Sequence, residues 1–271
     1  MRNTFSQTLY EEAVANPDIH IVVSDISPVG SMTKFSAEFP DRFINVGVAE
    51  QSMIGICAGL ALKGCRPFAY SIATFSLYRP FEMVRDDLCY QNLPVTVVGM
   101  GAGMIYSTLG GTHHTQEDIA IAGALPNMQI VAPCDPVECA EATRWCARQE
   151  NGPVYLRLGK AGEPVLTADA EPWQFGKIRY LRRGGGGDIC ILTYGVITGM
   201  AVRIADRLKA QGRPPCGACS SMTMTWRWRC RASRIPARSS GFRVWTTARE
   251  GGLPCACRRS AILAAMPVMT P

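Results

Sequence analysis

The chain has 271 residues, of which 47% are hydrophobic and 18% are charged, a composition that predicts a globular protein with a sizeable core. No apolar run reaches the roughly 18 residues that a membrane-spanning helix needs, so the sequence predicts no membrane protein. The net charge of +6 comes from residues 213–271, which hold ten Arg and one Glu, whereas residues 1–212 carry 18 basic and 21 acidic residues. Because the positive charge is confined to this segment, the net charge of the whole chain does not indicate nucleic-acid binding.

Residues 1–160 show helical and strand patterns in alternation. Helices are expected at residues 3–15, 51–63, 81–91, 112–125 and 135–149. Short apolar runs predict buried strands at residues 19–26, 43–48, 66–72, 94–102, 128–133 and 153–159. Apolar strands that alternate with helices are typical of an α/β fold, a parallel sheet with helices on both faces. Reactive side chains are then expected at the carboxyl ends of the strands.

The C-terminal part of the chain has a different character. Residues 161–187 lack the alternation and are interpreted as a linker, and residues 188–212 have the pattern of the start of a second α/β domain. In residues 213–271 no periodicity persists, and Arg, Pro, Cys and Trp accumulate as they do when a GC-rich gene is read out of frame. We therefore interpret this disrupted tail as the product of a frameshift near residue 212. A four-thiolate zinc site and the binding of single-stranded nucleic acid are alternatives for the tail, but its cysteine pairs lack the flanking pattern of zinc knuckles.

The first 18 residues, MRNTFSQTLYEEAVANPD, are polar and acidic, unlike a signal peptide or a transit peptide. Seven of the 12 cysteines lie singly in apolar segments of residues 1–212, as small core residues do in a reducing compartment. Both observations predict a cytoplasmic protein.

A single carboxylate stands at a predicted strand-to-helix junction, Glu50 in the stretch FINVGVAEQSM. Its neighbours are largely apolar, and a buried carboxylate is costly unless a partner compensates it. The sequence pattern leaves two interpretations open. Glu50 is either a helix-start acid stabilised by the helix dipole or a carboxyl whose partner is a ligand.

Two other stretches carry side chains suited to chemistry. Phe75, Tyr78 and Phe81 recur every third residue after a strand, a spacing that fits core packing and also a flat heterocycle stacked on the first ring. His113 and His114 lie in a Gly-Gly-Thr-His-His loop that enters a helix. No cysteine or carboxylate spacing supports a zinc site around this pair, so no metal ligand is predicted in the chain.

Five motifs carry a family resemblance. In chain order they are FINVGVAEQSM, TFSLYRPFE, LGGTHHTQEDIA, LPNMQIVAPCDPVE and GPVYLRLGK. Together they resemble the pyrimidine-binding half of the thiamine-diphosphate enzymes in the transketolase and deoxyxylulose-phosphate synthase group. The resemblance is dense over residues 1–160 and continues to about residue 212 as the start of the family's C-terminal domain.

The resemblance implies a role for each cofactor-binding candidate. Glu50 matches the catalytic glutamate that hydrogen-bonds N1′ of the cofactor's aminopyrimidine, where it shares or donates a proton and so promotes loss of the thiazolium C2 proton. The expected partner of this carboxyl is therefore thiamine diphosphate. Phe75 matches the residue that stacks on the pyrimidine, and Tyr78 and Phe81 line the pocket, with core packing an equal alternative for Phe81. Asp25, in VVSDIS, matches a strand-end residue near the cofactor.

The resemblance also implies substrate contacts. His113 matches a catalytic histidine beside the substrate hydroxyls, and the adjacent His114 either contacts substrate or supports the loop. Arg157, in YLRLG, matches an arginine that binds a sugar phosphate, a task that suits a forked guanidinium. A surface salt bridge at the strand end is the alternative for Arg157. Leu109 stands where full-length transketolases carry an acidic residue that meets a substrate hydroxyl, which weakens the match to full transketolase specificity.

The chain contains the motifs of only one half of the family's active site. No Gly-Asp-Gly followed by an Asn about thirty residues later occurs in it, so the diphosphate and Mg²⁺ site is expected on another polypeptide. The short N-terminus resembles the family's split form, in which this chain is the C-terminal subunit. The implied partner is an N-terminal diphosphate-binding transketolase subunit, in an α2β2 assembly.

The implied reaction is transfer of a two-carbon ketol unit between sugar phosphates. Two other reactions stay open, both with release of CO₂ from a 2-oxoacid: that of a deoxyxylulose-phosphate synthase-like enzyme and that of a 2-oxoacid dehydrogenase β-like subunit. An inactive subunit with a disrupted last domain is a further alternative, and a nucleic-acid-binding protein would rest on the Arg-rich tail alone.

Overall fold

The computed structural model describes residues 1–26, 30–183, 189–213, 215, 217–220, 223–225 and 261–263. The helices are α1 (Arg2–Ala15), α2 (Ser31–Glu38), α3 (Glu50–Leu62), α4 (Phe81–Met83), α5 (Asp118–Gly123), α6 (Pro136–Arg148) and α7 (Thr198–Ala210), with two π-helical segments, η2 (Thr74–Tyr78) and η3 (Val84–Tyr90). The strands are β1 (Ile19–Val23), β2 (Phe43–Asn45), β3 (Arg66–Ile72), β4 (Thr96–Met100), β5 (Gln129–Val131), β6 (Val154–Arg157), β7 (Arg179–Arg183), β8 (Cys190–Thr193), β9 (Gly217–Ser220), β10 (Thr223–Thr225) and β11 (Ala261–Leu263).

The main sheet has the order β10-β5-β6-β4-β3-β1-β2. Its first six strands in chain order, β1 to β6, pair in parallel, and β10 joins antiparallel beside β5. The predicted α/β fold with a parallel sheet is therefore confirmed. Because the six parallel strands point the same way, the loops after β1, β2, β3, β4 and β6 open at one edge of the sheet.

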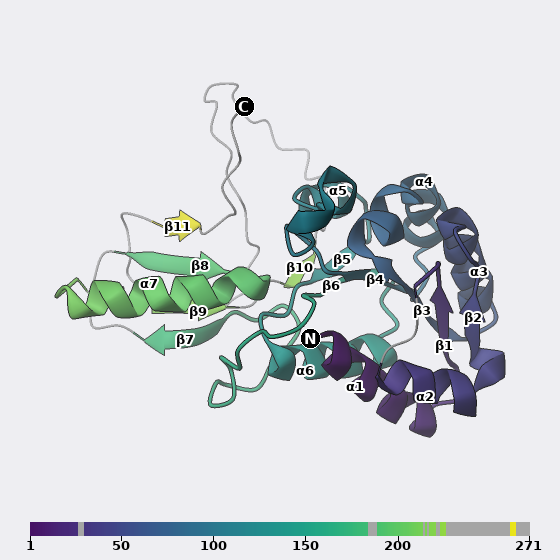
Figure 1. The fold of residues 1–271 in the computed structure, drawn as a ribbon, viewed down its shortest axis with the longest axis horizontal. Coiled ribbons are helices and arrows are strands. Elements are labelled where there is room, and N and C mark those ends of the chain that lie inside the picture. The colour runs from purple at the N-terminus through teal and green to yellow at the C-terminus, as the bar shows by residue number, and fades with distance from the viewer. Residues whose placement is uncertain are drawn as a thin grey trace, which may run out of the picture.

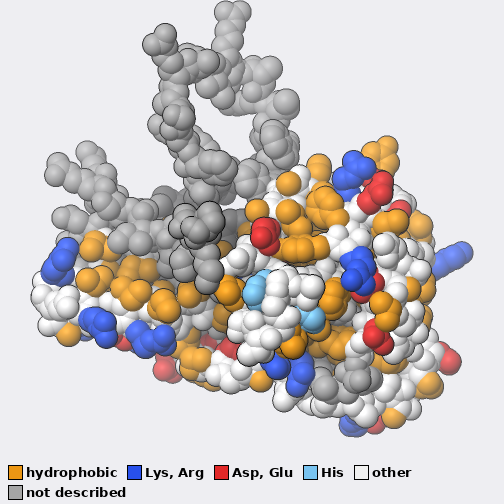
Figure 2. Space-filling model, turned by 45° about the horizontal axis from the view of Figure 1, so that its top comes forward, with side chains coloured by type: hydrophobic (Ala, Val, Ile, Leu, Met, Phe, Trp, Pro, Cys, Tyr) orange, Lys and Arg blue, Asp and Glu red, His pale blue; other side chains and the backbone are white. Residues whose placement is uncertain are grey.

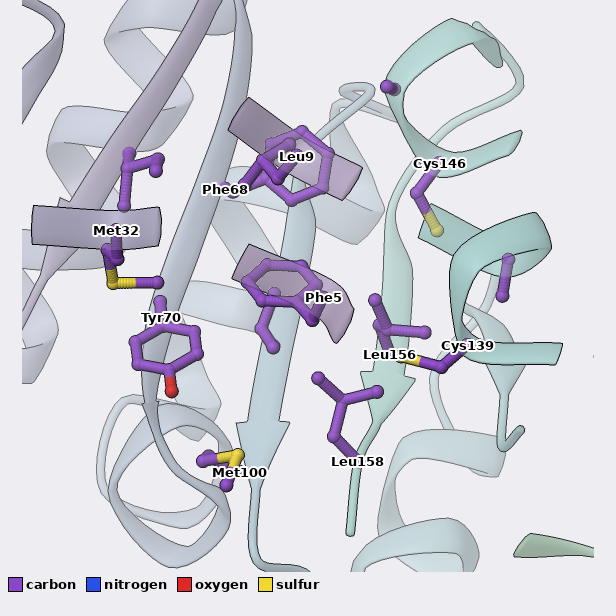
Figure 3. Close-up of a cluster of buried hydrophobic side chains, with 14 of the residues drawn as sticks. Phe5, Leu9, Met32, Phe68, Tyr70, Met100, Cys139, Cys146, Leu156 and Leu158 are labelled. Atoms are coloured by element: carbon purple, nitrogen blue, oxygen red, sulfur yellow. The ribbon is translucent and has the colours of Figure 1, made fainter. Parts of the chain in front are cut away.

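Alternating side chains of the strands build a core on each face of the sheet. In β3, Phe68 and Tyr70 pack toward α1, α2 and α6, whereas Ala69 packs toward α3, η3 and α5. Figure 1 shows these two helical layers on opposite sides of the strands. On the first face, Phe5 of α1 stacks on Tyr70 with ring centroids 5.6 Å apart, and Figure 3 shows Cys146 of α6 within the same cluster.

The structure differs from the expected elements at two places. The expected helix at residues 112–125 is wrong in its first half, because α5 begins only at Asp118. Before it, Gly110 takes a positive φ of 80°, and the Thr115 hydroxyl accepts a hydrogen bond from Gly103 N at 2.6 Å, so this stretch closes a loop. Helix α2 was not predicted, since its eight residues bury only Met32 and Phe35.

A second, smaller sheet follows in the chain and has the order β11-β8-β9-β7. Strand β7 lies in residues 161–187, which the sequence pattern predicts to be a linker, and α7 packs beside β8 and β9 (Figure 1). The N-cap carboxylate Asp135 of α6 accepts hydrogen bonds from the backbone of Leu166 and Thr167, which attaches the start of this segment to the first domain. Most of residues 213–271 lies outside the described residues, and the frameshift interpretation of this segment therefore stays a prediction.

Gly99 on β4 faces the ring of Tyr155 on β6. A Cβ at Gly99 would lie 2.7 Å from Cε2 and 2.9 Å from Cζ of Tyr155. The ring is held in place because its Oη donates to Asp118 at 2.9 Å. We expect Gly99→Ala to lower the free energy of unfolding by about 1–3 kcal/mol, the usual cost of overpacking a core, as measured by urea unfolding.

Gly59→Ala provides the matched control for this substitution. The added methyl would have no heavy atom within 4 Å, and Gly59 lies on the exposed side of α3. Because Ala favours a helix over Gly, the control is expected to raise the free energy of unfolding by up to about 1 kcal/mol. Wild-type stability of Gly99→Ala would contradict the close packing of Tyr155 against β4.

Candidate active site

Glu50 lies where the chain passes from β2 into α3. The turn between them runs through Gly47, whose φ is 65°, and Ser24 Oγ donates to Gly47 O at 2.8 Å, which ties the turn to the end of β1. Glu50 is the first residue of α3 and is only 3% exposed. The carboxyl is thus buried at the carboxyl edge of the sheet.

Arg79 is a protein partner of Glu50 that was not predicted from the sequence. Its Nη1 donates to Oε1 of Glu50 at 3.1 Å and to Oε2 at 3.3 Å. The guanidinium carbon also lies 5.0 Å from the ring centroid of Phe75. One guanidinium therefore contacts both residues that the resemblance assigns to the aminopyrimidine, and it reduces the cost of burying the Glu50 carboxylate.

His113 reaches Phe75 from the loop that follows β4. The two ring centroids are 5.3 Å apart and the rings meet edge to face at 75°. Tyr106 flanks the same imidazole at 6.2 Å, and Thr112 Oγ1 lies 2.9 Å from its Nδ1. Glu50, Phe75 and His113 thus come from the ends of three different strands, and Figure 2 shows histidine side chains at the surface beside hydrophobic groups.

The other two aromatic candidates lie next to this group. Tyr78 Oη donates to Glu117 Oε2 at 3.0 Å, and burial together with this hydrogen bond raises the pKa of Tyr78 above its ordinary value. Tyr78 and Phe81 are half-buried and pack against the core between the sheet and α3. This packing is the alternative that the sequence left open for Phe81, and the pocket-lining role of both residues stays a prediction.

The remaining candidates of this edge, His114 and Asp25, have less defined surroundings. His114 Nε2 lies 3.4 Å from Ser107 O within its own loop, a contact that supports the loop. Asp25 follows β1, is exposed and takes a positive φ of 41°. Their contacts to substrate and cofactor stay predictions.

Arg157, at the end of β6, forms a buried ion pair. Its Nε donates to Asp118 Oδ2 at 2.7 Å, and the Tyr155 hydroxyl donates to the same oxygen at 2.9 Å. Arg157 is 9% exposed and Asp118 is fully buried. Burial alone would lower the pKa of Arg157, but the Asp118 carboxylate together with the Tyr155 and Tyr194 side chains raises that pKa above its ordinary value. The salt bridge considered from the sequence is therefore present, although buried, and phosphate binding by Arg157 stays a prediction.

Three side chains of this site were not predicted from the sequence: Arg79, Tyr106 and Asp118. Arg79 did carry a local signal, because it stands four residues after Phe75 in a segment with helical spacing, where side chains meet. Asp118 carried none, since its partner Arg157 is 39 residues away in the chain.

These residues fit a planar cationic heterocycle. Glu50 accepts hydrogen bonds from a planar cation, and that cation covers the ring of Phe75. Thr74, next to Phe75, has a buried hydroxyl without a hydrogen-bond partner among the described residues. A cofactor pyrimidine could use all three groups. Within the part of the chain that the structure describes, no cluster of three or more His, Cys, Asp or Glu suits a metal ion.

The fold and these side chains define an α/β domain with a buried carboxyl and an aromatic ring at the carboxyl ends of its parallel strands. The family described as "Transketolase, pyrimidine binding domain" matches residues 1–162, and the chain belongs to this family. The predicted resemblance to thiamine-diphosphate transketolases is therefore confirmed. No helix in the described ranges is both long and apolar enough to cross a membrane.

Similar proteins agree with this assignment. The chain is 37% identical to an apulose-4-phosphate transketolase subunit of Actinobacillus succinogenes over 70% of this chain and 61% of that protein. It is 33% identical to the 1-deoxy-D-xylulose-5-phosphate synthase of Trichormus variabilis over 77% of this chain and 33% of the synthase. A solved split-gene transketolase, an inactive β4 tetramer, matches with a TM-score of 0.71 and 33% identity over 80% of this chain and 70% of that one.

Proposed function

We propose that the chain is the C-terminal subunit of a split thiamine-diphosphate-dependent transketolase that transfers a two-carbon ketol unit between sugar phosphates. The observation that carries the proposal is the buried Glu50 carboxyl beside Phe75 and His113 in a member of the pyrimidine-binding family. The similarity to one subunit of an apulose-4-phosphate transketolase and to a split-gene transketolase supports the split arrangement.

Thiamine diphosphate, when bound, supplies the carbon nucleophile and the electron sink for ketol transfer. Glu50 would hold N1′ of its aminopyrimidine and exchange a proton there, which is the role of a positioned general acid–base group. Phe75 would stack on the ring, with Tyr78 and Phe81 closing the pocket and Asp25 at its rim. His113 would hydrogen-bond substrate hydroxyls.

The rest of the site would come from a partner. The sequence has no Gly-Asp-Gly motif, so an N-terminal subunit would hold the diphosphate and Mg²⁺. The chain spans 61% of the length of its apulose-4-phosphate transketolase relative, which is itself one subunit. An α2β2 assembly would place two such shared sites in one enzyme. Free cysteines throughout the described residues fit a cytoplasmic location.

The proposal is tested by co-expressing the chain with an N-terminal transketolase subunit that carries Gly-Asp-Gly and the later Asn. We expect the two to co-elute on size exclusion and, with thiamine diphosphate and Mg²⁺, to transfer a ketol unit from a ketose phosphate without release of CO₂. Release of CO₂ from pyruvate would instead support the synthase-like alternative, which the match to a deoxyxylulose-phosphate synthase favours. A pair that does not assemble would indicate an inactive subunit.

A further inference from the structure

Arg79 makes the two contacts that the proposed function reserves for the cofactor. Its guanidinium donates to both oxygens of Glu50 and lies over the ring of Phe75. A guanidinium is planar, carries N–H donors and stacks on aromatic rings, and an aminopyrimidine that shares the Glu50 proton at N1′ has the same three properties. The two groups therefore compete for the same carboxyl and the same ring face.

The exposure of the pair makes this contact displaceable. The Arg79 side chain is 46% exposed, whereas that of Glu50 is 4% exposed. Water can therefore solvate Arg79 when it leaves, but Glu50 stays buried and needs a replacement partner. A bound ligand that offers Glu50 a hydrogen bond can therefore exchange for Arg79, because the guanidinium regains water while the buried carboxyl keeps a partner.

The local backbone supplies a reason why Arg79 can reach both groups. Phe75 lies in the π-helical segment η2, and Arg79 follows directly at its end, with its backbone N–H bonded to Thr74 O at 3.4 Å. In a helical segment, residues four apart lie on the same side, which brings the Arg79 side chain over Phe75. The side chain then extends to the first turn of α3, where Glu50 lies.

We propose that Arg79 occupies the aminopyrimidine's place at Glu50 and Phe75 when no cofactor is bound, and that thiamine diphosphate binds by displacing it. The inference rests on the proposed function and adds a regulatory contact to that site. Arg79 keeps the buried carboxylate of the empty site compensated and lowers the apparent affinity for the cofactor by the fraction of molecules in which it is in place.

The test compares three variants of the full chain: Arg79→Gln, Arg79→Lys and Arg85→Gln. Arg85 is the matched control, an exposed arginine of the following segment whose ion pair is with Asp86 at 3.2 Å. Thiamine diphosphate affinity is measured by calorimetry in the complex with the N-terminal subunit, and thermal unfolding is measured on the isolated chain. These readouts do not depend on turnover.

If Arg79 competes with the cofactor, Arg79→Gln lowers the dissociation constant for thiamine diphosphate by up to about tenfold, as expected when a blocked state populated near 90% is removed. Arg79→Lys keeps the charge without the planar fork, so its dissociation constant is expected between those of Arg79→Gln and the wild type. Arg85→Gln leaves the dissociation constant unchanged. The isolated Arg79→Gln chain unfolds at a lower temperature than Arg85→Gln, and adding Glu50→Gln removes that difference.

Two outcomes would overturn the proposal. Normal cofactor binding by the wild-type complex with an unchanged or larger dissociation constant in Arg79→Gln would show that Arg79 does not compete, and the proposed function would stand. Absence of thiamine diphosphate binding by the wild-type complex would overturn the proposed function and this inference together.

Discussion

Glu50→Gln is expected to lower kcat of the assembled enzyme at least about 100-fold, because a positioned acid–base group typically contributes about 10²–10⁴-fold to the rate. The carboxamide keeps the size of the side chain and can still accept a hydrogen bond from Arg79, which donates to Glu50 now. It cannot exchange a proton with N1′. The fold should therefore persist while turnover is lost, as measured by steady-state ketol transfer and by circular dichroism.

The control for this substitution is Glu82→Gln, which removes the same charge from a less buried residue of α4. Its kcat should equal that of the wild type within a factor of two or so, since Glu82 is exposed and its charge is screened by water and salt. Full turnover in Glu50→Gln would refute the role assigned to the carboxyl, whatever the control shows.

The sequence predicts the sheet well where each strand is apolar on both faces. The strand expected at residues 66–72 has the same bounds in the structure, because β3 contributes Phe68 and Tyr70 to one core and Ala69 to the other. Helix α2 has too few buried residues to show a period. The loop before α5 follows from the pairing of Gly103 with Thr115, a contact across twelve residues that no local pattern encodes.

The same distinction applies to the site. Glu50, Phe75 and His113 stand in sequence motifs, and parallel strands bring the ends of their segments to one edge. The two ion pairs of the site could not be predicted, because Arg79 lies 29 residues from Glu50 and Asp118 lies 39 residues from Arg157. The helical spacing of Arg79 indicated only its contact with Phe75. These pairs arise from packing between elements. Because each arginine compensates a buried carboxylate, replacing it changes stability as well as any ligand contact.

Arg157→Ala is expected to lower the free energy of unfolding by about 3–5 kcal/mol, since it leaves a buried carboxylate without its cation. Asp118 is fully buried and would keep the Tyr155 hydroxyl, a neutral donor, in place of a positive charge. Adding Asp118→Asn should restore part of the loss, because the uncompensated charge is then removed. Urea unfolding of the single and double variants measures both effects.

The surface pair of Arg182 and Asp206 provides the control, because the two side chains are 47% and 52% exposed. Arg182→Ala should cost only about 0–1 kcal/mol. An equally small loss in Arg157→Ala would contradict the buried pair.

The predicted phosphate contact needs a variant that keeps a cation beside Asp118. Arg157→Lys should raise KM for phosphorylated substrates and leave KM for unphosphorylated substrates unchanged. The reason is that the forked donor is lost while the Asp118 carboxylate stays compensated. An equal rise for both kinds of substrate would assign Arg157 to the support of the site through Asp118 and would exclude phosphate recognition by its guanidinium.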